Sequence, residues 1–114
     1  MSLEPEILKT FKAADTFEQL TITLDRAPAA GATVLAQIRD AVDVLVHQWS
    51  TAEGTAVING RDIVLARVAP AQTRAWPVGI HGFEVQLISA GKTTTQIYRE
   101  ELAIEVYGDG AYVE

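Results

Sequence analysis

Residues 55–68, TAVINGRDIVLARV, decide the fold of this chain, because they read as two β-strands joined by a tight turn. Both central positions of a type I′ turn need positive φ, which Asn and Gly adopt most readily, so Asn59-Gly60 predicts such a turn. The predicted strands cover residues 55–58 and 61–68. In the second strand Ile63 and Leu65 alternate with Asp62, Val64 and Ala66, which predicts one buried face and one partly covered face.

The same rhythm of short apolar runs separated by Gly, Pro and Asp continues on both sides of this hairpin. Further strands are predicted over residues 17–24, 33–39, 42–49, 80–88, 93–98 and 101–107, and one helical turn over residues 70–75, which begins with Pro. Turn signals at intervals of about 8 to 12 residues are typical of a sandwich or barrel. We therefore predict an all-β, antiparallel β-sandwich of about seven to nine short strands with at most one short helical turn.

One segment admits a second interpretation. Residues 32–46 are apolar enough to form a helix when they are considered alone. Their β-branched residues and the Arg39-Asp40 interruption favour two strands joined by a turn. We expect the two strands.

With 114 residues, the chain has the usual size of one domain. We predict a single β-sandwich domain over residues 14–114 and an amino-terminal arm over residues 1–13. Ile7, Leu8 and Phe11 of the arm are apolar at helical spacing, so the arm could dock onto a partner. It could equally pack on its own domain, as a first-turn helix or as an added strand.

Charge and composition exclude several functions. The net charge is −6 and the basic residues are scattered, whereas binding to nucleic acid or to a membrane surface needs a basic patch. The absence of cysteine excludes disulfides, thiolate nucleophiles and Cys-ligated metals. Residues 1–12 lack the pattern of a signal peptide, and no apolar stretch is long enough to span a bilayer. We therefore expect synthesis in the bacterial cytoplasm.

The chain offers no recognisable catalytic or metal-binding pattern. None of its serines lies in a strained Gly-flanked turn, and His47 and His81 are too far apart in sequence for a shared helical metal site. Glu100 and Glu101 are adjacent, so in a strand they point to opposite faces. Asp109 is the lone carboxylate of a Gly-Asp-Gly turn. We nominate no catalytic, cofactor-binding or metal-ligating residue, and expect a protein that is not an enzyme and needs no cofactor.

Three aromatic residues are the candidates for contact with a partner or ligand: Trp49, Trp76 and Phe11. An exposed Trp can stack on a sugar ring or anchor a protein partner, and Phe11 lies in the arm. In a domain of this size, both Trp residues could instead be packing residues of the core.

Five stretches together resemble a known family: Ala14-Asp15-Thr16-Phe17, Ala36–Asp40, Ile63–Val68, Ala71–Gly79 and Phe83–Leu87. They are similar to the small β-sandwich domains encoded among phage and prophage tail genes, akin to the amino-terminal domain of baseplate upper proteins. The likeness extends over most of the chain in short, degenerate pieces. Two features depart from the family pattern: Ala14 stands where Gly is usual, and Ile80–Glu84 replaces a segment that tends to hold Tyr and Asp.

The resemblance implies an immunoglobulin-like sandwich that serves as a structural or assembly adaptor of a phage tail or baseplate. It implies other tail or baseplate proteins as partners, a possible homo-oligomer, and a final location in the virion. The alternative is a β-sandwich that binds a small ligand or a glycan through Trp49 or a loop, and it predicts a groove lined by aromatic side chains.

Overall fold

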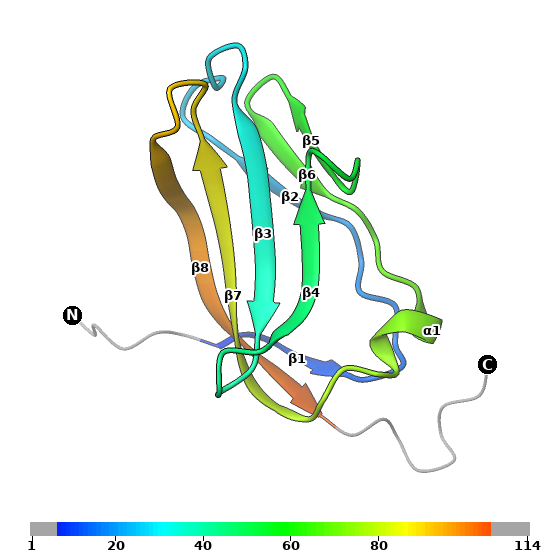
Figure 1. Ribbon diagram of the computed structural model, residues 1–114. Coiled ribbons are helices and arrows are strands. Elements are labelled where there is room, and N and C mark those ends of the chain that lie inside the picture. The colour runs from blue at the N-terminus through cyan, green and yellow to red at the C-terminus, as the bar shows by residue number, and fades with distance from the viewer. Residues whose placement is uncertain (1–6, 106–114) are drawn as a thin grey trace.

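The computed structural model describes residues 7–105, and it is a sandwich of two β-sheets (Figure 1). The elements are β1 (Ile7–Lys12), β2 (Leu20–Thr23), β3 (Thr33–Arg39), β4 (Leu45–Ser50), β5 (Ala56–Asn59), β6 (Asp62–Leu65), α1 (Pro70–Thr73), β7 (Gly79–Ile88) and β8 (Thr94–Glu105). One sheet has the order β1-β8-β7-β3-β4, and the other has the order β2-β6-β5. The predicted all-β sandwich with one short helical turn is confirmed.

The central hairpin forms as predicted, but its turn lies one residue later. Asn59 pairs with Asp62, so the two loop residues are Gly60 and Arg61. Gly60 has φ +62°, and neither Asn59 nor Arg61 has positive φ. Positive φ at the first loop position alone is the type II′ pattern, so the prediction of type I′ was wrong. In β6, Ile63 is fully buried while Asp62 is half-buried, as the alternation predicted.

The ambiguous segment forms two strands. β3 covers the predicted residues 33–39, whereas β4 begins at Leu45 rather than Val42. The reason is Asp40, whose Oδ1 accepts the N–H groups of Val42 at 3.0 Å and Val44 at 2.9 Å. These hydrogen bonds close a turn and keep both valines out of the ladder.

The last strand is longer than expected. Two strands were predicted over residues 93–98 and 101–107, but Thr94–Glu105 is one strand of 12 residues. It pairs with β7 over residues 94–104, with a register shift at Ile97. Residues 106 and 107 lie outside the described residues.

The arm contributes a strand to the larger sheet. β1 pairs in parallel with β8, and Phe11 lies opposite Ile104. The helical spacing of its apolar residues was therefore misleading, and residues 7–12 of the arm pair with their own domain as an added strand. Within residues 7–105, no helix has the length and hydropathy that crossing a bilayer requires.

The core lies between the two sheets and is rich in aromatic rings. Phe17 is 2% exposed and sits at its centre, with ring centroids 5.6 Å from Trp49, 5.7 Å from Trp76 and 6.3 Å from Phe83. Rings at these separations in tilted and edge-on arrangements stabilise a core beyond their buried area. Both sheets therefore share one core.

Ala14, in the connection from β1 to β2, has a backbone conformation that is unfavourable for alanine. Ala14 is fully buried and has φ +73°, in the left-handed region where a Cβ is unfavourable. The family pattern described above has Gly at this position. Its neighbour Ala13 is also buried, but its φ is not positive.

We predict that Ala14→Gly and Ala13→Gly have different effects on stability. Ala14→Gly removes the left-handed strain, which offsets the lost methyl group and the greater entropy of the unfolded chain, so its effect on the free energy of unfolding is within about 0.5 kcal/mol. Ala13→Gly relieves no strain and costs about 1–1.5 kcal/mol. Urea unfolding followed by circular dichroism measures both, and equal losses would contradict the strain at Ala14.

Candidate functional site

The three aromatic candidates are all buried. Trp49 is fully buried, and Trp76 and Phe11 are each 5% exposed. The Trp49 indole N–H donates to the Ala66 carbonyl oxygen at 2.8 Å, which satisfies its one polar atom inside the core. The burial of both Trp side chains agrees with the alternative that they are packing residues of the core, and contact of the three side chains with a partner or ligand stays a prediction.

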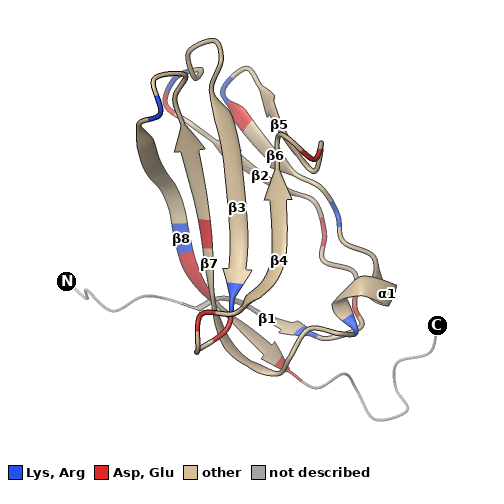
Figure 2. Cartoon of the chain, in the orientation of Figure 1, with Lys and Arg blue, Asp and Glu red and all other residues tan. Residues whose placement is uncertain are grey.

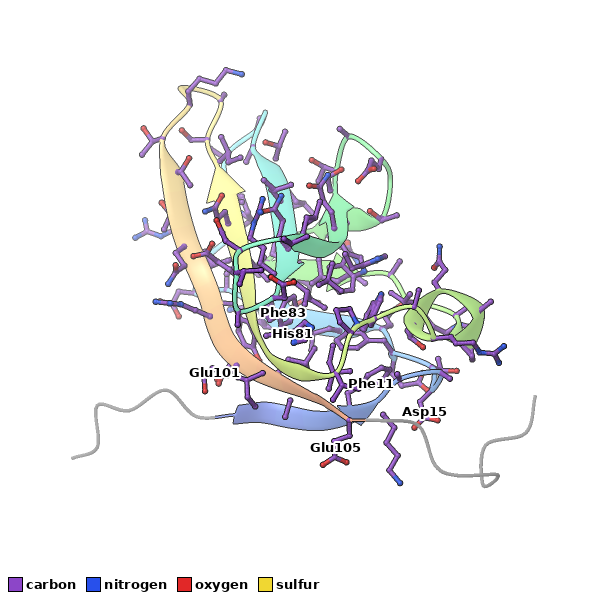
Figure 3. All side chains as sticks on the ribbon, turned by 60° about the horizontal axis from the view of Figure 1, so that its bottom comes forward. Phe11, Asp15, His81, Phe83, Glu101 and Glu105 are labelled. Carbon is purple, nitrogen blue, oxygen red and sulfur yellow. The ribbon has the colours of Figure 1, made fainter. Side chains whose placement is uncertain are left out.

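The two histidines lie in different surroundings. His81 of β7 points inward with Phe83 and Phe11, whereas Glu101 and Glu105 point outward (Figure 3). Its Nδ1 lies 3.0 Å from the Gly79 carbonyl oxygen, so Nδ1 carries the hydrogen. In the described part of the chain its Nε2 has no hydrogen-bond partner. We interpret His81 as a structural residue.

His47 of β4 is half-buried beside the aromatic core. Its ring is 4.5 Å from that of Trp49, edge-on, and 5.4 Å from that of Trp76. Burial lowers the pKa of His47 below its ordinary value of 6.5, and the negative charge of Glu53 opposes this shift. Burial therefore favours the neutral form of the imidazole.

This pKa predicts a dependence of stability on pH. Below about pH 6.5 the unfolded chain binds a proton at His47, whereas the folded chain binds it only at lower pH. The contribution of His47 to stability is therefore complete above about pH 6.5 and is lost as the pH falls through the lowered pKa of the folded state. We expect the loss in stability between pH 7.5 and pH 5.5, measured by urea unfolding, to be smaller in His47→Gln than in the wild type. Identical pH profiles for the two proteins would contradict this prediction.

The acidic residues do not gather into a site. In residues 7–105, no three His, Asp or Glu side chains are close enough to hold a metal ion. Glu100 and Glu101 lie in β8, opposite Phe83 and Gly82 of β7. Asp109 is outside the described residues, so the structure does not bear on the interpretation of its turn.

The surface feature most suited to binding is a group of exposed apolar side chains at one end of the sandwich, which we call the apolar end. It consists of Val42, Val44, Leu45, Val78 and Ile80. Their exposed fractions are 78%, 55%, 44%, 57% and 47%, respectively, which is high for large apolar side chains. They come from the β3–β4 turn, the first residue of β4 and the chain around the beginning of β7, which lie together at the bottom of Figure 1.

Two hollows adjoin the apolar end. One, of about 440 Å³, is bordered by Val44 and Leu45 on one side and by α1 and Trp76 on the other. The second, of about 250 Å³, is bordered by Val42, Val78 and Ile80. Both share Asp40 and Pro77, so the two hollows and the five side chains form one surface.

The charges near the apolar end are few and already engaged. Arg39 donates to the Gln37 side chain at 3.1 Å and to the Asp43 carbonyl oxygen at 3.0 Å, and its Nε is 3.9 Å from the Asp43 carboxylate. The Asp40 carboxylate holds the turn. In Figure 2 the blue and red bands near the β3–β4 turn are these charged residues, and β4 has no charged residue.

The sequence argument missed this surface. It assigned Val42 and Val44 to a strand over residues 42–49, because an apolar run usually continues a strand. The overlooked signal was Asp40-Ala41-Val42-Asp43, in which two aspartates flank the first valine. Asp is common in turns because its carboxylate caps nearby N–H groups, so apolar residues inside such a turn are left on the surface.

Comparisons with known proteins add little to this description. No family model matches the chain, and no curated protein matches it. Among solved structures, one that is similar is the crystal structure of CopC from Methylosinus trichosporium OB3b, with a TM-score of 0.49 and 12% sequence identity. The match covers 93% of this chain and 98% of that one. A likeness at this level carries no argument about ligand, partner or activity.

Proposed function

We propose that this chain is a structural or assembly adaptor that acts through protein–protein contact, as a component of a phage or prophage tail or baseplate. The observation that carries the proposal is the apolar end, where five large apolar side chains are exposed together. Monomeric proteins seldom expose such groups contiguously unless the surface binds a partner. The tail assignment itself rests on the resemblance between short stretches of the sequence and small sandwich domains of tail proteins.

The rest of the molecule is consistent with an adaptor rather than an enzyme. In the described residues, the inward-facing aromatic and aliphatic side chains form a continuous packed core. The net charge of −6 opposes a nucleic-acid partner. After assembly the adaptor would reside in the virion.

A module for a small ligand or a glycan is the competing function. It needs aromatic faces open to a ligand, since sugars stack on exposed rings. The hollow beside α1 is bordered by His47 and Trp76, but Trp76 is 5% exposed and offers little of its ring. The apolar end therefore favours the protein partner.

Co-purification with the products of neighbouring genes tests the proposal. The wild-type chain should retain at least one of these products, and the double variant Val42→Lys, Ile80→Lys should lose it, because two charges would enter an apolar contact. Val57→Lys is the matched control, since Val57 is 51% exposed on β5 of the other sheet. Unchanged retention by the double variant, or no retained product for the wild type, would overturn the proposed contact.

A further inference from the structure

The tip of the β5–β6 hairpin holds Asn59, which is the one asparagine of the chain and is followed by Gly60. Asn59 is the last residue of β5, and Gly60 and Arg61 are the two residues of the loop. Asn59 and Gly60 are both exposed. An asparagine that precedes glycine can react with its own backbone, so the surroundings of this pair decide its chemical stability.

The reaction is deamidation through a cyclic imide. The backbone nitrogen of Gly60 attacks Cγ of the Asn59 side chain, so a bond forms between these two atoms. The bond from Cγ to the side-chain nitrogen breaks, and this nitrogen leaves as ammonia with the proton of the Gly60 N–H. Water then opens the five-membered ring at either carbonyl carbon, which gives aspartate or isoaspartate. The reaction therefore needs water, but no oxidant, reductant or cofactor.

Both reacting groups are accessible in the hairpin. Within residues 7–105, neither the Gly60 N–H nor the Asn59 side-chain amide makes a hydrogen bond, and the Asp62 carboxylate opposite Asn59 accepts from Thr23 at 2.7 Å instead. A Cβ at Gly60 would meet no heavy atom within 4 Å, so this side of the loop is open space. Water can therefore reach the ring, and no side chain at position 60 hinders the attack.

The hairpin tip can also open without unfolding the domain. β5 has 4 residues and, in the described part of the chain, pairs with β6 alone, at the edge of the smaller sheet. The ends of short edge strands open with free energies far below that of global unfolding. Closing the ring requires rotation about the backbone of Asn59, and opening of the Asn59–Asp62 pair is enough to allow it.

We propose that Asn59 is a site of spontaneous deamidation in the folded protein. Isoaspartate adds one carbon to the backbone and so disturbs a loop of two residues. Aspartate places a negative charge directly opposite Asp62, and like charges in this position destabilise a sheet. Both products therefore weaken the β5–β6 hairpin. The hairpin tip lies at the top of Figure 1 and the apolar end at the bottom, so this inference is independent of the proposed function.

Mass spectrometry of the full chain tests the proposal. Incubation at about pH 8.5 should raise the mass by about 1 Da, because an OH group replaces an NH₂ group. Trypsin cleaves after Arg39 and Arg61, so residues 40–61 form one peptide, which should separate into asparagine, aspartate and isoaspartate forms. Asn59→Gln is the matched control. It keeps an amide but would have to close a six-membered ring, so we expect no change at position 59.

The rate in the folded chain, relative to the same chain unfolded in guanidinium chloride, shows whether the native turn permits the reaction. If Asn59 reacted only after global unfolding, the folded chain would react about 10³-fold more slowly or slower still. Because only the hairpin tip has to open, we expect the two rates to differ by about tenfold or less. A folded chain that reacts about 100-fold more slowly, or slower, would show that the turn protects Asn59 and would overturn the proposal.

Asn59→Asp tests the expected consequence, because it adds the charge of one product without the longer backbone. Its midpoint of urea unfolding should be lower than that of the wild type, and the aged wild type that contains isoaspartate should also have a lowered midpoint. Equal midpoints for all three would overturn the predicted weakening of the hairpin. A mass increase that maps to a glutamine, with position 59 unchanged, would overturn the site itself.

Discussion

Trp49→Ala is expected to cost about 3–5 kcal/mol in the free energy of unfolding, which is a large part of the stability of a typical domain. Trp49 is fully buried, and its ring packs against Phe17 at 5.6 Å and Phe83 at 5.6 Å. Truncation leaves a cavity at the junction of the two sheets. It also leaves the Ala66 carbonyl oxygen without its indole donor.

Trp49→Phe separates these two effects. The phenyl ring keeps much of the packing but lacks the N–H, so we expect a smaller loss, with about 1 kcal/mol attributable to the missing hydrogen bond. Urea unfolding followed by far-ultraviolet circular dichroism compares both variants without relying on Trp fluorescence. A loss below about 1 kcal/mol for Trp49→Ala would show that the indole does not fill the core as described.

Phe11→Ala is the second substitution with a large expected effect, about 3 kcal/mol or more. Phe11 anchors β1, with its ring 5.4 Å from that of Phe17 and 5.6 Å from that of Trp76. Phe11→Ala removes these ring contacts, and the parallel pairing of β1 with β8 remains. The arm should then detach readily from the sheet.

Lys12→Ala is the matched control for Phe11, because Lys12 is exposed on the same strand. We expect its effect to stay within about 0.5 kcal/mol. Limited proteolysis should cleave Phe11→Ala near the arm sooner than the wild type. If Phe11→Ala and Lys12→Ala lost equal stability, the arm would not be part of the core.

The sequence predicted most of the fold, because local signals and tertiary contacts agree over most strands. β3 has its predicted bounds, and the alternation in β7 correctly placed Phe83 and Val85 on the buried face. The errors occurred where one local signal admits two outcomes. Asn59-Gly60 supports more than one two-residue turn, and the pairing of Asn59 with Asp62, together with positive φ at Gly60 and not at Arg61, gives type II′.

The candidate site was predicted less well than the fold. Trp49 and Trp76 were candidates because a Trp is a common contact residue, yet burial depends on strands distant in the sequence. The apolar end depends on where β4 begins, which the Asp40 carboxylate determines through two backbone hydrogen bonds. Such contacts form in three dimensions, and alternation along a single strand does not reveal them.

The parallel pairing of β1 with β8 also constrains when the domain can finish folding during synthesis. Phe11 lies opposite Ile104, and Lys12 lies opposite Glu105, so strands from both ends of the described chain must meet. The β5–β6 hairpin involves only nearby residues and can form early, whereas the β1–β8 pair closes the longest loop and is slow to form. An emerging chain therefore carries β1 without its partner strand until residue 105 has left the ribosome. During that interval Phe11 is available to chaperones or to another nascent copy.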